Sequence, residues 1–197
     1  MDNRLFTIGD IHGCFDSFYS LVQKLQLTKS DTLVLLGDYI DRGSDSKKVI
    51  DYILELQDSG INVITLMGNH ESMLLDAYAN PDLESKWLIN GGSDTLKSFG
   101  IDNLNRLELN YVTFFKSLDL FFESGKYLFV HAGFNDELED PFSDAYHMLW
   151  KCRKKYQNPL LLNRVIIHGH CPIAVSRCDE HIKTAPKVIN LDTGCVY

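Results

Sequence analysis

The sequence predicts an α/β protein with a single domain over residues 1–197, on three observations. Short apolar runs alternate with stretches of helical periodicity, which is typical of strand–helix–strand units. No repeat, low-complexity tract or Pro/Gly-rich linker divides the 197 residues, a length that suits one domain. Hydrophobic residues make up 45% of the chain and charged residues 23%, which excludes a disordered or collagen-like protein.

Three strand–helix units open the chain. A helix with one apolar face follows the first predicted strand, and a second helix, with Ser44 as its expected cap, follows the second strand. Because each strand leads into a crossover, we expect the three strands to lie parallel with right-handed connections. The three predicted strands are Leu5–Ile8, Thr32–Leu36 and Asn62–Met67.

Residues 71–119 have a helical periodicity that glycines interrupt, and we interpret them as a helical excursion over one edge of the sheet. A hairpin across Ser124-Gly125 is expected after this excursion. The segment Asn135–Ser143 is rich in acidic residues and contains a proline, which predicts a surface loop. The strands expected in this half of the chain are Leu120–Glu123, Lys126–Val130, Arg164–Ile167 and Val188–Leu191.

Charge and composition exclude several classes of protein. The net charge of −8 argues against a general nucleic-acid binder, because the overall field repels a phosphate backbone. The apolar runs are too short to span a bilayer, so no membrane partner is expected. The five cysteines include no C-x-x-C pair, and the chain opens on Met-Asp-Asn-Arg without a leader-like run. We therefore expect a cytoplasmic, monomeric protein with reduced thiols.

Polar residues follow five of the apolar runs, each beside a glycine. In a largely parallel sheet the carboxyl ends of the strands lie along one edge, where ligands bind. Residues that are far apart in the sequence are therefore expected to meet at that edge. The five residues are Asp10, Asp38, Asn69, His131 and His170.

The chemistry of these side chains, together with His12, points to a metal centre. Carboxylate, amide and imidazole groups without sulfur suit Mn²⁺, Fe or Zn²⁺ better than Ca²⁺, and there are enough ligands for two ions. Two ions about 3.5–4 Å apart activate a shared water and neutralise charge during displacement at phosphorus. We expect two divalent ions, with manganese first and Fe, Zn, Ni or Mg as alternatives.

Several blocks of the sequence resemble a known family. Residues 9–13, 37–43 and 68–71 (GDIHG, GDYIDRG and GNHE) are similar to the signature blocks of phosphoprotein-phosphatase-type, calcineurin-like metallophosphoesterases. His131-Ala132-Gly133 and residues 169–172 (GHCP) resemble the later histidine blocks of that family. Trp87, Asn90-Gly91-Gly92 and Thr95 resemble its small bacterial forms, which include lambda-phage-type serine/threonine phosphatases and diadenosine tetraphosphatases. The resemblance implies a four-layered α/β/β/α sandwich.

The resemblance also implies a role for each site residue. A bridging hydroxide would attack phosphorus in line, His70 would protonate the leaving oxygen, and Asp41 would orient the His70 ring and raise its pKa. Arg42 would bind phosphate oxygens. Asp10 and His12 would hold the first metal, Asp38 would bridge, and Asn69, His131 and His170 would complete the second metal.

One position departs from the bacterial pattern. Those forms place a second phosphate-binding arginine two residues after a Leu-Trp pair, and here Cys152 stands at that position. We take Arg153, one residue later, as the second substrate-binding arginine.

These features predict a phosphoester hydrolase, with the substrate left open between two classes. The net charge and the single basic run at residues 151–155 favour a serine/threonine-type protein phosphatase, whose basic phosphopeptides the acidic loop at Asn135–Ser143 could select. The alternative is a dinucleoside tetraphosphate hydrolase, which shares the same motifs. A third alternative, a non-catalytic scaffold of the same fold, would be marked by a missing ligand or general acid, and all of those residues are present. The expected partner is a phosphorylated protein or a small phosphoester.

Overall fold

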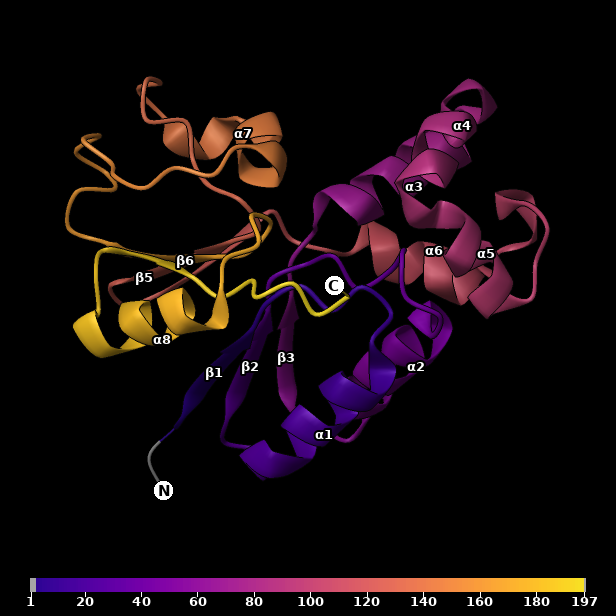
Figure 1. Ribbon diagram of the computed structural model, residues 1–197, viewed down its shortest axis with the longest axis horizontal. Coiled ribbons are helices and arrows are strands. Elements are labelled where there is room, and N and C mark those ends of the chain that lie inside the picture. The colour runs from indigo at the N-terminus through magenta and orange to yellow at the C-terminus, as the bar shows by residue number, and fades with distance from the viewer. Residues whose placement is uncertain (1–2, 197) are drawn as a thin grey trace.

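The structure, a computed structural model that describes residues 3–196, contains two β-sheets packed face to face (Figure 1). The ends of the expected domain, residues 1–2 and 197, lie outside the described residues. The first sheet is parallel in the order β1-β2-β3, and the second has the order β4-β5-β6-β7 with only β4 antiparallel to its neighbour. The strands are β1 (Leu5–Ile8), β2 (Thr32–Leu35), β3 (Asn62–Thr65), β4 (Phe121–Ser124), β5 (Tyr127–Val130), β6 (Val165–His168) and β7 (Val188–Asn190).

Alternation along β2 explains why this strand lies between two apolar layers. Leu33 and Leu35 face the core beneath the helices, whereas Val34 and Leu36 face the second sheet. All four side chains are fully buried. Because successive side chains of a strand point to opposite faces, a run that is apolar throughout belongs to a strand covered on both sides.

Helices α1 (Phe15–Leu25) and α2 (Ser46–Asp58) cover the outer face of the first sheet (Figure 1). The expected apolar face of α1 is confirmed, since Phe18 and Val22 are buried. The expected cap was wrong by one residue. Asp45 is the N-cap of α2, and the Ser44 hydroxyl donates a hydrogen bond to the Asp45 carboxylate instead of to the helix.

The helical excursion is confirmed, although its first helix starts at Asn69 rather than after Glu71. Figure 1 shows its helices gathered on the side of α2. Gly91 lies at φ 109° inside a π-helical turn, Leu88–Gly92, and this is the break that the glycine pair indicated. The α-helices are α3 (Asn69–Ala79), α4 (Glu84–Trp87), α5 (Ser93–Phe99) and α6 (Leu109–Lys116), with 3₁₀ turns at Pro81–Leu83 and Leu104–Arg106.

The second half of the chain forms the other two layers. The predicted hairpin is confirmed, with Ser124 paired to Tyr127 across the turn. Helix α7 (Ala145–Trp150) and its neighbouring loops cover the outer face of this sheet, and α8 (Val175–Thr184) packs beside β7. The structure is therefore a four-layered α/β sandwich, as expected. No helix in the described part of the chain is long and apolar enough to cross a membrane.

The contact between the sheets predicts a stability effect at Phe129. Its side chain is 1% exposed and packs in the layer that joins the two sheets. Phe129→Ala should lower the free energy of unfolding by about 3–5 kcal/mol, because it leaves a cavity that the sheets cannot close. Urea denaturation measures this loss. Leu109→Ala, at a side chain that is 76% exposed, is the control and should change stability by less than about 0.5 kcal/mol; equal losses in both variants would contradict the interpretation.

Candidate metal centre

The candidate site lies where the carboxyl ends of strands from both sheets meet. Three of the expected residues follow β1, β2 and β3 of the first sheet, and two follow β5 and β6 of the second. The argument from strand ends treated all five as lying at the edge of one largely parallel sheet, whereas the structure has the two β layers that the family resemblance implied. Two sheets converge there, because the layer between them brings β2 against β5 and β6. The residues are Asp10, Asp38, Asn69, His131 and His170.

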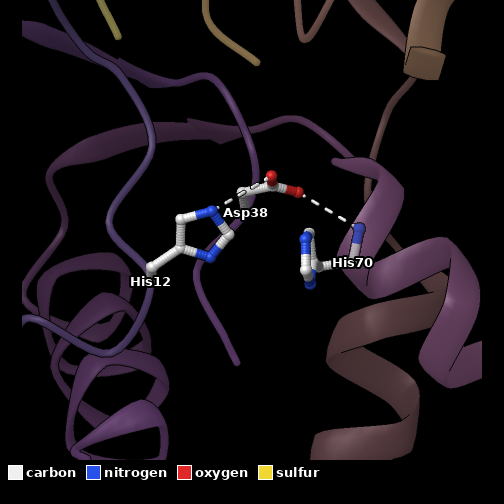
Figure 2. A group of neighbouring side chains, drawn as sticks. All are labelled: His12, Asp38 and His70. Carbon is white, nitrogen blue, oxygen red and sulfur yellow. Dashed lines mark hydrogen bonds and ion pairs between the residues drawn. The ribbon is translucent and has the colours of Figure 1, made fainter. Parts of the chain in front are cut away.

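Asp38 is shared between two groups of ligand atoms. Its Oδ2 lies 3.4 Å from Nε2 of His12 and 3.5 Å from Nε2 of His131. Its Oδ1 accepts a hydrogen bond of 3.1 Å from the backbone N–H of His70, and Figure 2 shows the carboxylate between His12 and His70. One carboxylate oxygen therefore faces both sides of the site.

The backbone fixes which nitrogen each of these histidines presents. Nδ1 of His12 lies 2.9 Å from the carbonyl oxygen of Ile40, and Nδ1 of His131 lies 2.9 Å from that of Leu36. A carbonyl can only accept, so both Nδ1 atoms carry the proton. Both Nε2 atoms therefore present a lone pair to the site, in the arrangement common among metal-binding histidines.

The donor set beside His131 fits a cation. Its Nε2 lies 2.9 Å from Oδ1 of Asn69 and 3.1 Å from Nδ1 of His170. Since the proton of His131 is on Nδ1, Nε2 and the amide oxygen are both acceptors and repel each other at this distance. A metal ion among the three atoms would turn this repulsion into coordination.

The site contains two triads of side chains that could each hold a metal ion. Within each triad, the three ligand atoms lie within 4.8 Å of one another. His70, expected to act without binding metal, belongs to the first triad, whereas Asp10 belongs to neither. The buried Asp10 carboxylate instead accepts the backbone N–H of His170 at 3.1 Å. The triads are His12, Asp38, His70 and Asp38, His131, His170.

Burial sets the charges of the site in the metal-free chain. It raises the pKa of Asp38 well above its usual range, and the neighbouring Asp10 adds to this shift. Burial also lowers the pKa of His12 to about 3 and that of His170 to about 4. The histidines are therefore neutral near pH 7, which is the form that binds metal ions.

His70 and Asp41 form the expected pair, with Nδ1 of His70 2.7 Å from Oδ2 of Asp41. The expected direction of the His70 pKa was wrong for the metal-free chain. Burial, reinforced by Arg42, lowers this pKa to about 3, and burial raises the pKa of Asp41 to about 7. Desolvation of the imidazolium outweighs the attraction of the carboxylate, because both side chains are almost fully enclosed.

The sequence analysis assigned no role to Glu71, which organises the loop after β2. Its fully buried carboxylate accepts the backbone N–H groups of Asp38 at 2.9 Å and Tyr39 at 2.8 Å, together with that of Gly68 at 3.0 Å. The signal was present in the sequence, since Glu71 is the third residue of α3, where a glutamate reaches back to the N-cap backbone.

Strained backbone is concentrated at the site. A positive φ is unfavourable for residues other than glycine, and each such residue costs about 1–3 kcal/mol. The hydrogen bonds to the buried carboxylates hold this backbone in place. The site residues with a left-handed φ, between 45° and 70°, are His12, Asp38, Asp41, Arg42 and His170.

Two glycines leave room for the carboxylates. A Cβ atom on Gly68 would overlap Oδ1 of Asp38, and one on Gly169 would overlap Oδ1 of Asp10. Only glycine fits at positions 68 and 169, because each backbone lies directly against the carboxylate of an aspartate from another part of the sequence.

The two expected phosphate-binding arginines are in different places. Nη1 of Arg42 lies 2.9 Å from Nε2 of His12, so this exposed side chain reaches the mouth of the site. The Arg153 guanidinium instead faces the acidic loop, 3.7 Å from Asp136 and 3.5 Å from Glu137.

Cys152 and Cys171 form a disulfide, so the expectation of reduced thiols was wrong for this pair. The bond joins the segment after α7 to the residue that follows His170. The two cysteines are 19 positions apart in the sequence, and only the packing of this segment onto the β6 loop brings them together. The thiols of Cys14, Cys178 and Cys195 are free.

Comparison with known proteins identifies the family. Residues 4–192 match the family described as calcineurin-like phosphoesterase. The chain is 34% identical over 131 residues to a symmetrical bis(5'-nucleosyl)-tetraphosphatase of Nitrosospira multiformis, covering 66% of this chain and 43% of that protein. It is 28% identical over 140 residues to serine/threonine-protein phosphatase 2 of Salmonella typhimurium, covering 70% of this chain and 62% of that one. The chain thus spans less than two thirds of the length of either relative.

A solved structure extends the comparison to the whole fold. The crystal structure of a putative diadenosine tetraphosphatase superposes with a TM-score of 0.67 at 18% identity, covering 99% of this chain and 85% of the other. This likeness confirms the four-layered fold.

The charges of the site predict how metal removal affects stability. Burial raises the pKa values of Asp41 and Glu71 to about 7, so the metal-free folded chain keeps protons that the unfolded chain has released. Its free energy of unfolding should therefore fall as the pH rises from 7 to 8. The lowered pKa values of the site histidines act in the opposite direction, mainly below about pH 7, because unfolded histidines lose their protons near pH 6.5. Urea denaturation in chelator at pH 7, 7.5 and 8 measures this slope.

Added Mn²⁺ should reverse the trend, because cation binding favours the ionised carboxylates and competes with protons. The increase in unfolding temperature on adding Mn²⁺ should be larger at pH 8 than at pH 7. An increase independent of pH, or stability in chelator that rises from pH 7 to 8, would contradict this account of the site.

Proposed function

Since this chain belongs to the calcineurin-like phosphoesterase family, we propose that it uses two divalent metal ions to hydrolyse dinucleoside tetraphosphates. The observation that carries the hydrolytic part is the position of Asp38, whose single oxygen Oδ2 faces Nε2 of both His12 and His131. A carboxylate shared by two sets of nitrogen ligands is the arrangement that a two-metal hydrolase requires.

The metal ligands remain those expected from the sequence. Two bound cations would supply Lewis-acid charge and an activated water. The ligands carry nitrogen and oxygen but no sulfur, which suits manganese and also admits iron or zinc. We assign Asp10, His12 and Asp38 to one ion and Asp38, Asn69, His131 and His170 to the other.

Two further side chains act directly on the substrate, and a third acts through one of them. Arg42, at the mouth of the site, binds phosphoryl oxygens with its planar guanidinium. His70, whose Nδ1 is held by the Asp41 carboxylate, takes up a proton from water at Nε2 once the phosphate anion lies beside it, and delivers that proton to the leaving oxygen. Asp41 thereby fixes the ring that carries the proton.

The choice of substrate reverses the preference drawn from the sequence. The sequence analysis placed a protein phosphatase first, on the acidic loop and the net charge. The comparisons give better support to dinucleoside tetraphosphates, through both the Nitrosospira relative and the matching crystal structure. The acidic loop supports peptide selection less than expected, since Asp136 and Glu137 face Arg153. Phosphoserine hydrolysis stays as the second candidate, on the Salmonella relative.

Parallel assays test the proposal. Protein stripped of metal and reloaded with Mn²⁺ should hydrolyse diadenosine tetraphosphate to adenosine diphosphate, and its kcat/KM should exceed that for a phosphoserine peptide at least about tenfold, which corresponds to 1.4 kcal/mol of transition-state preference. Chromatography of the nucleotides and phosphate release measure the two reactions. A preference for the peptide would support the second candidate, and no turnover on either substrate would reject both.

Substitution of the shared carboxylate tests the metal centre. Asp38→Asn should lower kcat/KM at least about 100-fold, since even partners of metal ligands contribute 10- to 100-fold. The bound metal, measured by atomic emission, should fall as well. Asp102→Asn is the matched control, because this aspartate is 67% exposed and its ion pair is with the equally exposed Arg106. Full activity in Asp38→Asn would exclude the bridging role.

A further inference from the structure

The helical excursion holds the loop that follows β2. The backbone N–H of Arg42 donates to the carbonyl oxygen of Gly91 at 3.3 Å, and the N–H of Asp41 donates to Oγ1 of Thr95 at 2.9 Å. Further along, the N–H of Lys47 donates to Oγ of Ser98 at 2.9 Å. Residues about 50 positions away in the sequence therefore fix the backbone that carries Asp41 and Arg42.

The same segment binds the carboxylate of Asp41. The indole Nε1–H of Trp87 donates to Oδ2 at 2.9 Å, and the hydroxyl of Thr95 donates to Oδ1 at 2.6 Å. The third donor is Nδ1 of His70, at 2.7 Å from Oδ2. Asp41 is fully buried, so these three donors replace the water that an exposed carboxylate would have.

Trp87 has little freedom to move. Its side chain is fully buried, and a Cβ atom on Gly92 would overlap the indole ring. A buried indole N–H needs an acceptor, and here that acceptor is the carboxylate of Asp41. Thr95 is 2% exposed, and its hydroxyl is within reach of the hydroxyl of Ser46 at 3.3 Å. Both donors are thus held rigidly on the excursion.

The hydrogen bonds from Trp87 and Thr95 also fix the ring of His70, because they hold the Asp41 carboxylate that binds it. A carboxylate fixed from both oxygens can accept the Nδ1 proton of His70 in only one direction, so it sets the tautomer and the plane of the ring. The His70 ring then stands edge-on to the ring of His12, with centroids 4.7 Å apart, and Nε2 is directed to the site. A small rotation of Asp41 would misdirect this nitrogen, and misplacement by 1 Å can cost about 100-fold in rate.

We propose that Trp87 and Thr95 are positioning residues for protonation of the leaving group, acting through Asp41 on His70. The inference rests on the proposed function in one respect, which is that His70 is the proton donor. It assigns a catalytic purpose to the excursion at residues 84–99, because this segment supplies both donors to Asp41 but no member of either ligand triad.

Substrates with different leaving groups separate this role from a structural one. Phenolate, whose conjugate acid has a pKa near 10, leaves slowly unless it is protonated, whereas p-nitrophenolate is far more stable as an anion. Trp87→Phe removes the N–H but keeps an aromatic ring, and Thr95→Val removes the hydroxyl at nearly constant shape. Thr95→Ser keeps the hydroxyl. Thr113→Val is the matched control, on an exposed part of α6.

Each of the first two variants should lower kcat/KM for phenyl phosphate about 10- to 100-fold and for p-nitrophenyl phosphate less than about threefold, since general acid catalysis contributes about 10²–10⁴. Thr95→Ser and Thr113→Val should resemble the wild type on both substrates. In a His70→Asn background, Trp87→Phe should cause no further loss on phenyl phosphate, because the residue it positions is gone.

A second measurement needs no turnover. In the metal-free protein, nitrogen-15 spectra of the imidazole should show His70 in the Nδ1–H tautomer, and Trp87→Phe combined with Thr95→Val should shift it toward a mixture of tautomers. Circular dichroism and metal content should stay unchanged in these variants.

Equal losses on both aryl phosphates, or additive losses in the His70→Asn background, would overturn the inference and leave the proposed function standing. Leaving-group-dependent losses together with no hydrolysis of diadenosine tetraphosphate would reject the proposed substrate and support the inference. An unchanged His70 tautomer in the double variant would also overturn it.

Discussion

Burial of four carboxylates at one edge is the constraint on which the rest of the structure depends. A buried carboxylate is tolerated only where donors or cations replace water, since desolvation costs several kcal/mol per ion. Here the donors come from separate loops: each carboxylate is bound by N–H or O–H groups of a different part of the chain. The four residues are Asp10, Asp38, Asp41 and Glu71.

These hydrogen bonds make the site and the fold interdependent. The carboxylate of Glu71 joins the start of α3 to the loop after β2, and that of Asp10 joins the end of β1 to the loop after β6. The loops could not keep left-handed residues such as His12 and His170 without such bonds, because each costs about 1–3 kcal/mol. Hydrogen bonds from backbone N–H groups to the buried carboxylates offset this strain. They thereby hold the candidate ligand atoms close together.

Much of this arrangement could be predicted from the sequence. Apolar runs, glycines and turn residues are local signals, and they located the strands and the excursion. Glycine–acid blocks also indicated which side chains would meet, since strand ends share an edge. The hydrophobic pattern alone could not distinguish two sheets from one, because a strand buried on both faces has the same pattern in either case. The two β layers were expected only from the family resemblance. The disulfide and the position of Arg153 depend on loop packing, which leaves no periodic signal.

The direction of the His70 pKa shows where sequence reasoning reaches its limit. A histidine paired with an aspartate suggests a raised pKa, and the pair exists. Burial of the ring reverses the sign, and burial is a property of the packed excursion rather than of the motif. The His70 pKa is lowered because residues that are near in space but distant in sequence exclude water from the ring.

The proposed substrate is a polyanion, whereas the protein is acidic, and this restricts where the binding energy would arise. A net charge of −8 repels a phosphate chain at long range, so attraction must come from a few cations at short range. Arg42 is at the mouth, whereas the charge of Arg153 faces Asp136 and Glu137. Under the proposed function, recognition of phosphate would therefore depend on Arg42 and the metal ions, and the excursion that fixes the Arg42 backbone would contribute to binding as well as to proton transfer.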